Sequence, residues 1–126
     1  MASGIDLVVT ADAATYAVAD DYELYQGKWE MFGQINVHDD STATLRFEFQ
    51  DSNGGDPVEL EEFYLTVFDL DEQKNDDRHK EELCVDAGQF DAYVLDDNSE
   101  VVVEERTTAC DGGDGASTVF KSSEAG

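Results

Sequence analysis

The stretch Thr44-Leu45-Arg46-Phe47-Glu48-Phe49-Gln50 alternates apolar and polar side chains. Successive side chains of a β-strand point to opposite faces of a sheet, so Leu45, Phe47 and Phe49 would share one face and the polar residues the other. This period of two predicts a half-buried strand. Residues 51–57 are rich in Asp, Asn, Ser, Gly and Pro, which predicts that the chain reverses its direction there.

Short apolar runs elsewhere predict further strands, at residues 5–10, 32–37, 63–68, 82–87, 90–95, 100–106 and 117–121. Run 63–68 is apolar on both sides, which favours a central strand of a packed sheet. The short connections between the last runs indicate an antiparallel meander, whereas residues 11–26 are expected to be irregular. We therefore predict an all-β fold, an antiparallel β-sandwich of jelly-roll or C2-like type with about seven to eight strands.

The composition is that of a folded domain with a strongly acidic surface. The chain has 126 residues, 40% of them hydrophobic, which suffices for one domain over residues 1–126. A formal net charge of −24 would repel nucleic-acid phosphates but suits bound cations, a basic partner or solubility at high salt. No apolar run reaches the length of a membrane span, so we expect no transmembrane segment. The way the chain begins and ends leaves open that it is a segment of a longer protein.

Two cysteines, Cys84 and Cys110, are too few for a metal cluster and lack the spacing of a metal-binding motif. One disulfide between them is the simplest interpretation. On the chain-entropy model it would stabilise the fold by about 3 to 4 kcal/mol. Two buried free thiols in a reducing compartment remain the alternative.

Candidate metal ligands follow the apolar run 65–68. Asp69 and Asp71 are two positions apart, and Asp77 comes later in the same polar stretch. Ca²⁺ takes about six to eight oxygen ligands from carboxylates and loop carbonyls, so these three residues predict a calcium site. Their spacing resembles the Asp-x-Asp-x5-Asp loop of C2 domains, which implies calcium binding at one end of a sandwich. The alternative is a solvated loop of an acidic protein.

Residues that could carry catalysis are sparse. His38 and His79 are the two histidines, and both lie in polar segments where a solvated imidazole is usual. The serines lack the context of a nucleophile elbow, and no glycine motif that cradles phosphate is present. We therefore predict that the chain is not an enzyme. Trp29, Tyr22 and Tyr25 are candidates for stacking on a sugar ring, although such aromatic residues also fill cores.

A wider resemblance extends over most of the chain. The residues that carry it are DLVVT at 6–10, MFGQINV at 31–37, LRFEFQDS at 45–52, PVEL at 57–60, FYLTVFDLD at 63–71 and GQFDAY at 88–93. In these stretches the chain is similar to uncharacterised β-sandwich modules in predicted proteins of marine algae with complex plastids, such as diatoms, dinoflagellates and haptophytes. The resemblance implies a β-sandwich in secreted or organelle-targeted proteins, with no activity to carry over.

We therefore expect a non-catalytic structural or interaction module of an extracellular, cell-surface or plastid assembly. Calcium is its candidate stabilising ion, and its partner would be another protein or further copies of itself. The alternative function is a calcium-dependent C2-like or carbohydrate-binding module.

Overall fold

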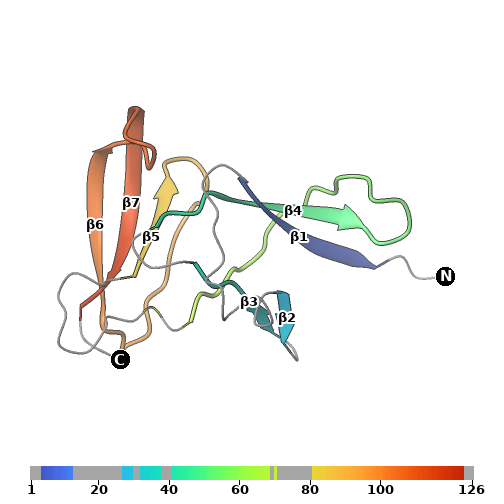
Figure 1. Cartoon of the computed structure of the whole chain (residues 1–126), viewed down its shortest axis with the longest axis horizontal. Coiled ribbons are helices and arrows are strands. Elements are labelled where there is room, and N and C mark those ends of the chain that lie inside the picture. The colour runs from blue at the N-terminus through green and yellow to red at the C-terminus, as the bar shows by residue number, and fades with distance from the viewer. Residues whose placement is uncertain are drawn as a thin grey trace. The chain divides into compact units, whose positions relative to one another are not determined.

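Antiparallel strands build the part of the chain that the structure describes. The computed structural model describes residues 4–12, 27–29, 32–37, 41–68, 70 and 81–123, as drawn in Figure 1. The strands are β1 (Ile5–Ala11), β2 (Gly27–Trp29), β3 (Phe32–Gln34), β4 (Leu45–Asp51), β5 (Glu82–Asp86), β6 (Val101–Thr108) and β7 (Asp114–Ser122). None of the described residues is helical, and every strand pair is antiparallel. The all-β, antiparallel prediction is therefore confirmed.

The chain divides into two compact units, Met1–Tyr64 and Leu65–Gly126. The first unit holds two two-stranded sheets, β1 with β4 and β2 with β3, and the second holds the three-stranded sheet β5-β7-β6. The expectation of a single domain over residues 1–126 stays a prediction. Within the described ranges, no helix has the length and hydropathy needed to cross a membrane.

In the first unit, β1 and β4 form a ribbon with an apolar face and a polar face. The register runs from Ile5 opposite Asp51 to Ala11 opposite Leu45. Opposite residues share a face, so Leu7 and Val9 lie beside Phe49 and Phe47. Phe63 packs edge-on against the Phe49 ring, with 4.8 Å between the ring centroids. The strands predicted at 5–10 and from residue 44 are thus confirmed, together with the predicted two faces of β4.

In the second unit, the last strand, β7, lies in the middle of its sheet. β5 pairs with β7 from Glu82 opposite Lys121 to Asp86 opposite Ser117, and β6 pairs with the other edge of β7. The best-buried described side chains therefore belong to β7, with Val119 fully buried and Ser117, Thr118 and Ser122 at most 5% exposed. The predicted strands 82–87, 100–106 and 117–121 are confirmed with small changes of length, but the predicted meander is wrong.

The prediction of a central strand at residues 63–68 is wrong. These residues form no strand, and Tyr64 and Phe68 are 85% and 67% exposed. The reason lies at the outer edge of β4, where the Val58 amide donates to the Phe49 carbonyl and Pro57 makes an isolated bridge. Among the described residues of this connection, Val58 is the last whose amide bonds to β4, so the chain leaves the sheet before it reaches the apolar run. The predicted reversal at residues 51–57 is present.

Residues 90–95 do not form the predicted strand either. β7 occupies the position between β5 and β6, and the connection between these two strands instead places Phe90 and Tyr93 against Phe120. These aromatic residues therefore pack their rings against one face of the sheet and do not join a hydrogen-bonded ladder. The strand predicted at 32–37 is shortened to Phe32–Gln34, and most of residues 11–26 lie outside the described part of the chain.

Candidate functional site

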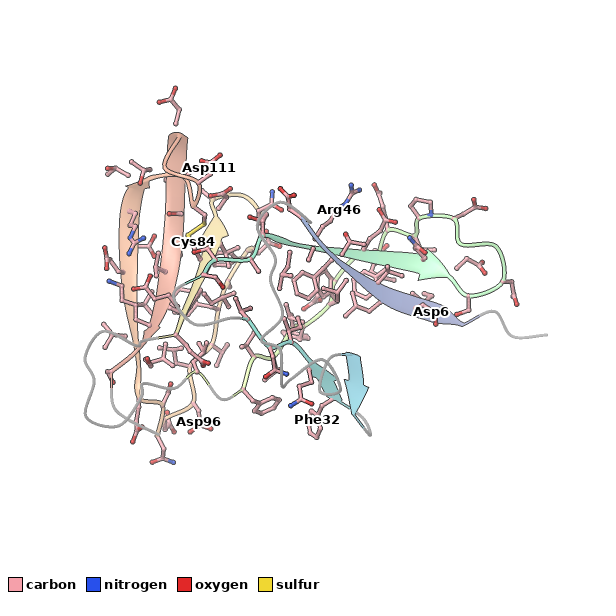
Figure 2. The ribbon with its side chains drawn as sticks, viewed as in Figure 1. Asp6, Phe32, Arg46, Cys84, Asp96 and Asp111 are labelled. Carbon is pink, nitrogen blue, oxygen red and sulfur yellow. A yellow bond between two sulfur atoms is a disulfide. The ribbon has the colours of Figure 1, made fainter. Side chains whose placement is uncertain are left out.

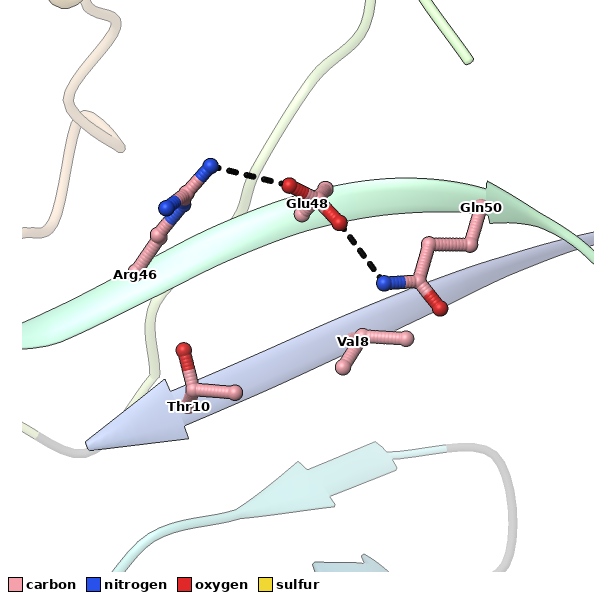
Figure 3. Close-up of a pocket in the computed structure, with 5 residues that line it drawn as sticks. All are labelled: Val8, Thr10, Arg46, Glu48 and Gln50. Atoms are coloured by element: carbon pink, nitrogen blue, oxygen red, sulfur yellow. Dashed lines mark hydrogen bonds and ion pairs between the residues drawn. The ribbon is translucent and has the colours of Figure 1, made fainter. Parts of the chain in front are cut away.

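The polar face of the β1–β4 ribbon carries a shallow depression of about 150 Å³ lined by Val8, Thr10, Arg46, Glu48 and Gln50 (Figure 3). These residues come together because alternate positions of two paired strands share one face. Arg46 Nη2 donates to Glu48 Oε2 at 2.9 Å, and Gln50 Nε2 donates to Glu48 Oε1 at 2.6 Å. Both oxygens of the carboxylate thus accept a hydrogen bond from its own strand, which fixes the side chain in place.

One face of the β5-β7-β6 sheet carries a network of four charged side chains, which we call the charged network: Glu82, Glu104, Arg106 and Lys121. Lys121 of the central strand binds Glu104 and lies 3.8 Å from Glu82. Arg106 Nε lies 3.1 Å from Glu104, and its Nη2 lies 3.8 Å from Glu82. Each cation therefore bridges carboxylates of two different strands.

The charged network favours the ionised form of Glu104. Hydrogen bonds from Lys121 first and from Arg106 second hold the pKa of the Glu104 carboxyl below its ordinary value. A general acid needs its pKa raised toward neutral pH, which is the opposite shift. The network is thus suited to holding three strands together, and it contains two of the seven basic residues of the chain.

The opposite face of the same sheet is mainly apolar, with a hydrogen bond from Thr118 to Glu105 toward one end. Leu83 and Val103 flank Phe120 in the register, and the rings of Phe90 and Tyr93 lie 6.4 Å and 5.2 Å from the Phe120 ring, between centroids. Tyr93 is still 46% exposed, and Val94 beside it is 91% exposed. The sheet therefore has one mainly apolar face and one face with the charged network, and the loop that covers the mainly apolar face presents apolar side chains to solvent.

The structure joins Cys84 of β5 to Cys110 in the loop between β6 and β7 (Figure 2). The Cys110 amide also donates to Asp86 Oδ1 at 2.7 Å, so two contacts hold this loop to β5. Gly112, with φ +86°, and Gly115, with φ +131°, take up left-handed backbone angles that a side chain would strain. The disulfide and the turn together fix this end of the sheet.

The outer edge of β1 is defined by the hydrogen bonds at the two ends of the ribbon. The Asp12 amide donates to the Thr44 carbonyl at 3.1 Å, and the Ser52 amide donates to the Gly4 carbonyl at 3.0 Å. Both pairs continue the β1–β4 register. Hydrogen-bonded and non-bonded pairs alternate along an antiparallel ladder, so the even-numbered residues of β1 are the ones that bond to β4.

The odd-numbered residues of β1 consequently direct their N–H and C=O groups away from β4. We call the edge that they form the free edge; its residues are Ile5, Leu7, Val9 and Ala11. In the described part of the chain β1 pairs with β4 alone. The side chains of Ile5, Leu7 and Val9 lie on the apolar face and are 39–50% exposed. The ribbon thus combines a free edge with an exposed apolar face.

Most residues singled out from the sequence lie outside the described ranges. This holds for the predicted calcium ligands Asp69, Asp71 and Asp77, for His38 and His79, and for Tyr22 and Tyr25. The backbone of Trp29 pairs with Phe32 in the short β2–β3 sheet. Among the described residues, no group of three or more His, Cys, Asp or Glu side chains is arranged to hold a metal ion. The calcium site and the sugar-stacking residues stay predictions.

Comparison of the chain with models of protein families, with curated proteins and with solved structures gave no match.

Proposed function

We propose that this chain is a non-catalytic structural or interaction module. The observation that carries the proposal is the number of large apolar side chains that a highly charged chain leaves in contact with solvent. Tyr64, Phe68 and Val94 are at least 67% exposed, and Phe47 and Phe63 are 39% and 53% exposed. In the first unit, Phe63 packs on Phe49 beside Phe47 and so continues the apolar face of the β1–β4 ribbon. Contiguous apolar surface marks interaction sites, because its exposure costs free energy that a partner recovers.

We also propose that the fold is an antiparallel β-sandwich. In support, the β1–β4 ribbon and the β5-β7-β6 sheet each have one mainly apolar and one polar face, as the layers of a sandwich do. A two-stranded ribbon is marginally stable by itself, which favours a second layer over its apolar face.

An oxidising location, extracellular or in an organelle lumen, belongs to the same proposal. The Cys84–Cys110 disulfide supports it, because disulfides persist outside reducing compartments. Calcium at Asp69, Asp71 and Asp77 belongs to the proposal as a stabilising ion, with ligand chemistry as its support.

Hydroxyl-radical footprinting tests the function directly. The folded chain would be labelled alone and in an extract of the cells that produce it, and labelling would be compared at Tyr64, Phe68 and Val94. An interaction module becomes protected at these side chains in the extract, whereas the buried Val119 is unlabelled in both samples. Equal labelling of the exposed residues in both samples would contradict the proposal.

A further inference from the structure

Among the described strands that lie at the edge of a sheet, β1 has the least protected edge. Its seven residues pair with β4 in unbroken register and include no Pro, Gly or Lys. β5 is only five residues long, and the β6 ladder has a register shift between Arg106 and Thr108. Proteins normally block an exposed strand edge with short length, a bulge, Pro or Lys, and β1 has none of these. Such an edge is a template on which another strand can add.

We propose that a partner strand of alternating apolar and basic residues adds to the free edge of β1. Its backbone would bond to the outward peptide groups of Leu7 and Val9, and its apolar side chains would extend the face formed by Ile5, Leu7 and Val9. This mode of binding takes its affinity from main-chain hydrogen bonds and its specificity from alternate side chains. The inference rests on the proposed role as an interaction module and names its surface and partner chemistry.

Charge selects a basic partner. The side chain of Asp6 lies on the polar face of β1, whose other members, Val8 and Thr10, are uncharged. In the unit Met1–Tyr64 the basic residues are Lys28 and Arg46 alone, and Arg46 is paired with Glu48. A second copy of the chain would bring a further charge of −24 and oppose edge-to-edge pairing, whereas Lys and Arg side chains would approach down the electrostatic gradient.

Amide hydrogen exchange of the whole chain, followed residue by residue by NMR, tests the inference. The probe is a synthetic peptide of alternating valine and lysine, and its control has glutamate in place of every lysine. In the free protein the amides of Leu7 and Val9 exchange fast, and those of Val8 and Thr10 exchange slowly. The lysine peptide slows Leu7 and Val9 by about tenfold or more, and the glutamate peptide does not.

A pair of variants separates edge pairing from general attraction between opposite charges. Val9→Pro removes an outward N–H but none of the bonds to β4, and proline is tolerated on such an edge. Val9→Thr keeps the N–H and a β-branched side chain. Fluorescence anisotropy with the labelled lysine peptide is expected to show at least a tenfold loss of affinity for Val9→Pro and little change for Val9→Thr. If Val9→Pro fails to fold, the exchange pattern of the wild type decides.

The other occupants of the edge give different results. Slow exchange at Leu7 and Val9 before any peptide is added means that the chain covers its own edge, and slowing with protein concentration alone means that a second copy does. Either result overturns the inference, as does equal affinity of the two Val9 variants. Peptide protection confined to residues 63–68 would overturn the edge site but leave the proposed function standing, whereas absent protection in the footprinting experiment would remove the function itself.

Discussion

Two buried serines of β7 show that the contribution of a hydroxyl to stability depends on whether it has a hydrogen-bond partner. Ser117 Oγ donates to the Thr108 carbonyl at 2.7 Å, whereas the buried Ser122 Oγ has no hydrogen-bond partner among the described residues. Their side chains are 1% and 3% exposed, so burial does not distinguish them. A buried polar group without a partner keeps its full desolvation cost.

Substitution of these serines is therefore predicted to change stability in opposite directions. Ser117→Ala should lower the free energy of unfolding by about 1 kcal/mol, and Ser122→Ala should raise it by about 1 kcal/mol or leave it unchanged. Urea denaturation followed by circular dichroism measures both variants. Equal destabilisation by the two substitutions would show that the Ser122 hydroxyl has a partner after all.

Glu104 is predicted to contribute to the acid sensitivity of the second unit. Its folded-state pKa lies below the ordinary value of 4.5 because Lys121 and Arg106 bond to it. A depressed folded-state pKa stabilises the fold above the unfolded-state pKa, and this stabilisation is lost as the pH falls through the folded-state value. Between pH 7 and pH 3, stability should therefore decrease less in Glu104→Gln than in wild type. Thermal unfolding between pH 7 and pH 3 measures both proteins, and an equal loss of stability in the two would contradict the prediction.

At the scale of elements, the disulfide is predicted to be the main stabilising link of the β5-β7-β6 sheet. It joins residues 26 apart in sequence, and a loop of this size corresponds to about 3 to 4 kcal/mol on the chain-entropy model. Cys84→Ala with Cys110→Ala, or reduction of the wild type, should lower the midpoint of thermal unfolding accordingly. The double variant provides the control for the reductant, since its midpoint should not change when reductant is added. An unchanged midpoint on reduction of the wild type would contradict the prediction.

The sequence predicts strands well where apolar and polar residues alternate and the edge of a neighbouring strand is available for pairing. β1 and β4 meet this condition, and their alternation also gives the correct faces. Residues 63–68 and 90–95 have a comparable apolar pattern, but the ladder on the outer edge of β4 ends at Val58, and β7 fills the place expected for residues 90–95. The local pattern of apolar residues contains no information about which strand edges are available for pairing.

The charged network and the free edge could not be predicted for the same reason. Glu82, Glu104 and Lys121 come from three strands, and only the register of β7 between β5 and β6 brings them together. Likewise, it is the hydrogen bonds at the two ends of the ribbon that determine that the odd-numbered residues of β1 direct their peptide groups outward. Cys84 and Cys110, in contrast, could be paired from the sequence because no other cysteine is present.

At the scale of the whole molecule, calcium and general screening of the −24 charge predict different responses. One calcium ion bound by Asp69, Asp71 and Asp77 should stabilise the fold by about 3 kcal/mol at a hundredfold excess over its Kd. Thermal unfolding would be measured with EDTA, with calcium and with magnesium at matched ionic strength. The variant Asp69→Asn/Asp71→Asn should lose the calcium effect and keep the response to salt. An equal effect of calcium and magnesium in the wild type would favour screening alone.

The position of β7 also imposes an order of events on synthesis at the ribosome. β5 and β6 are made first, yet neither pairs with the other, and each has its ladder partner in residues 114–122 (Figure 1). A nascent chain that ends before Asp114 therefore contains β5 and β6 but lacks β7, the strand with which both of them pair. The sheet can form only after β7 has left the exit tunnel, and until then the apolar side chains of β5 and β6 are accessible to chaperones.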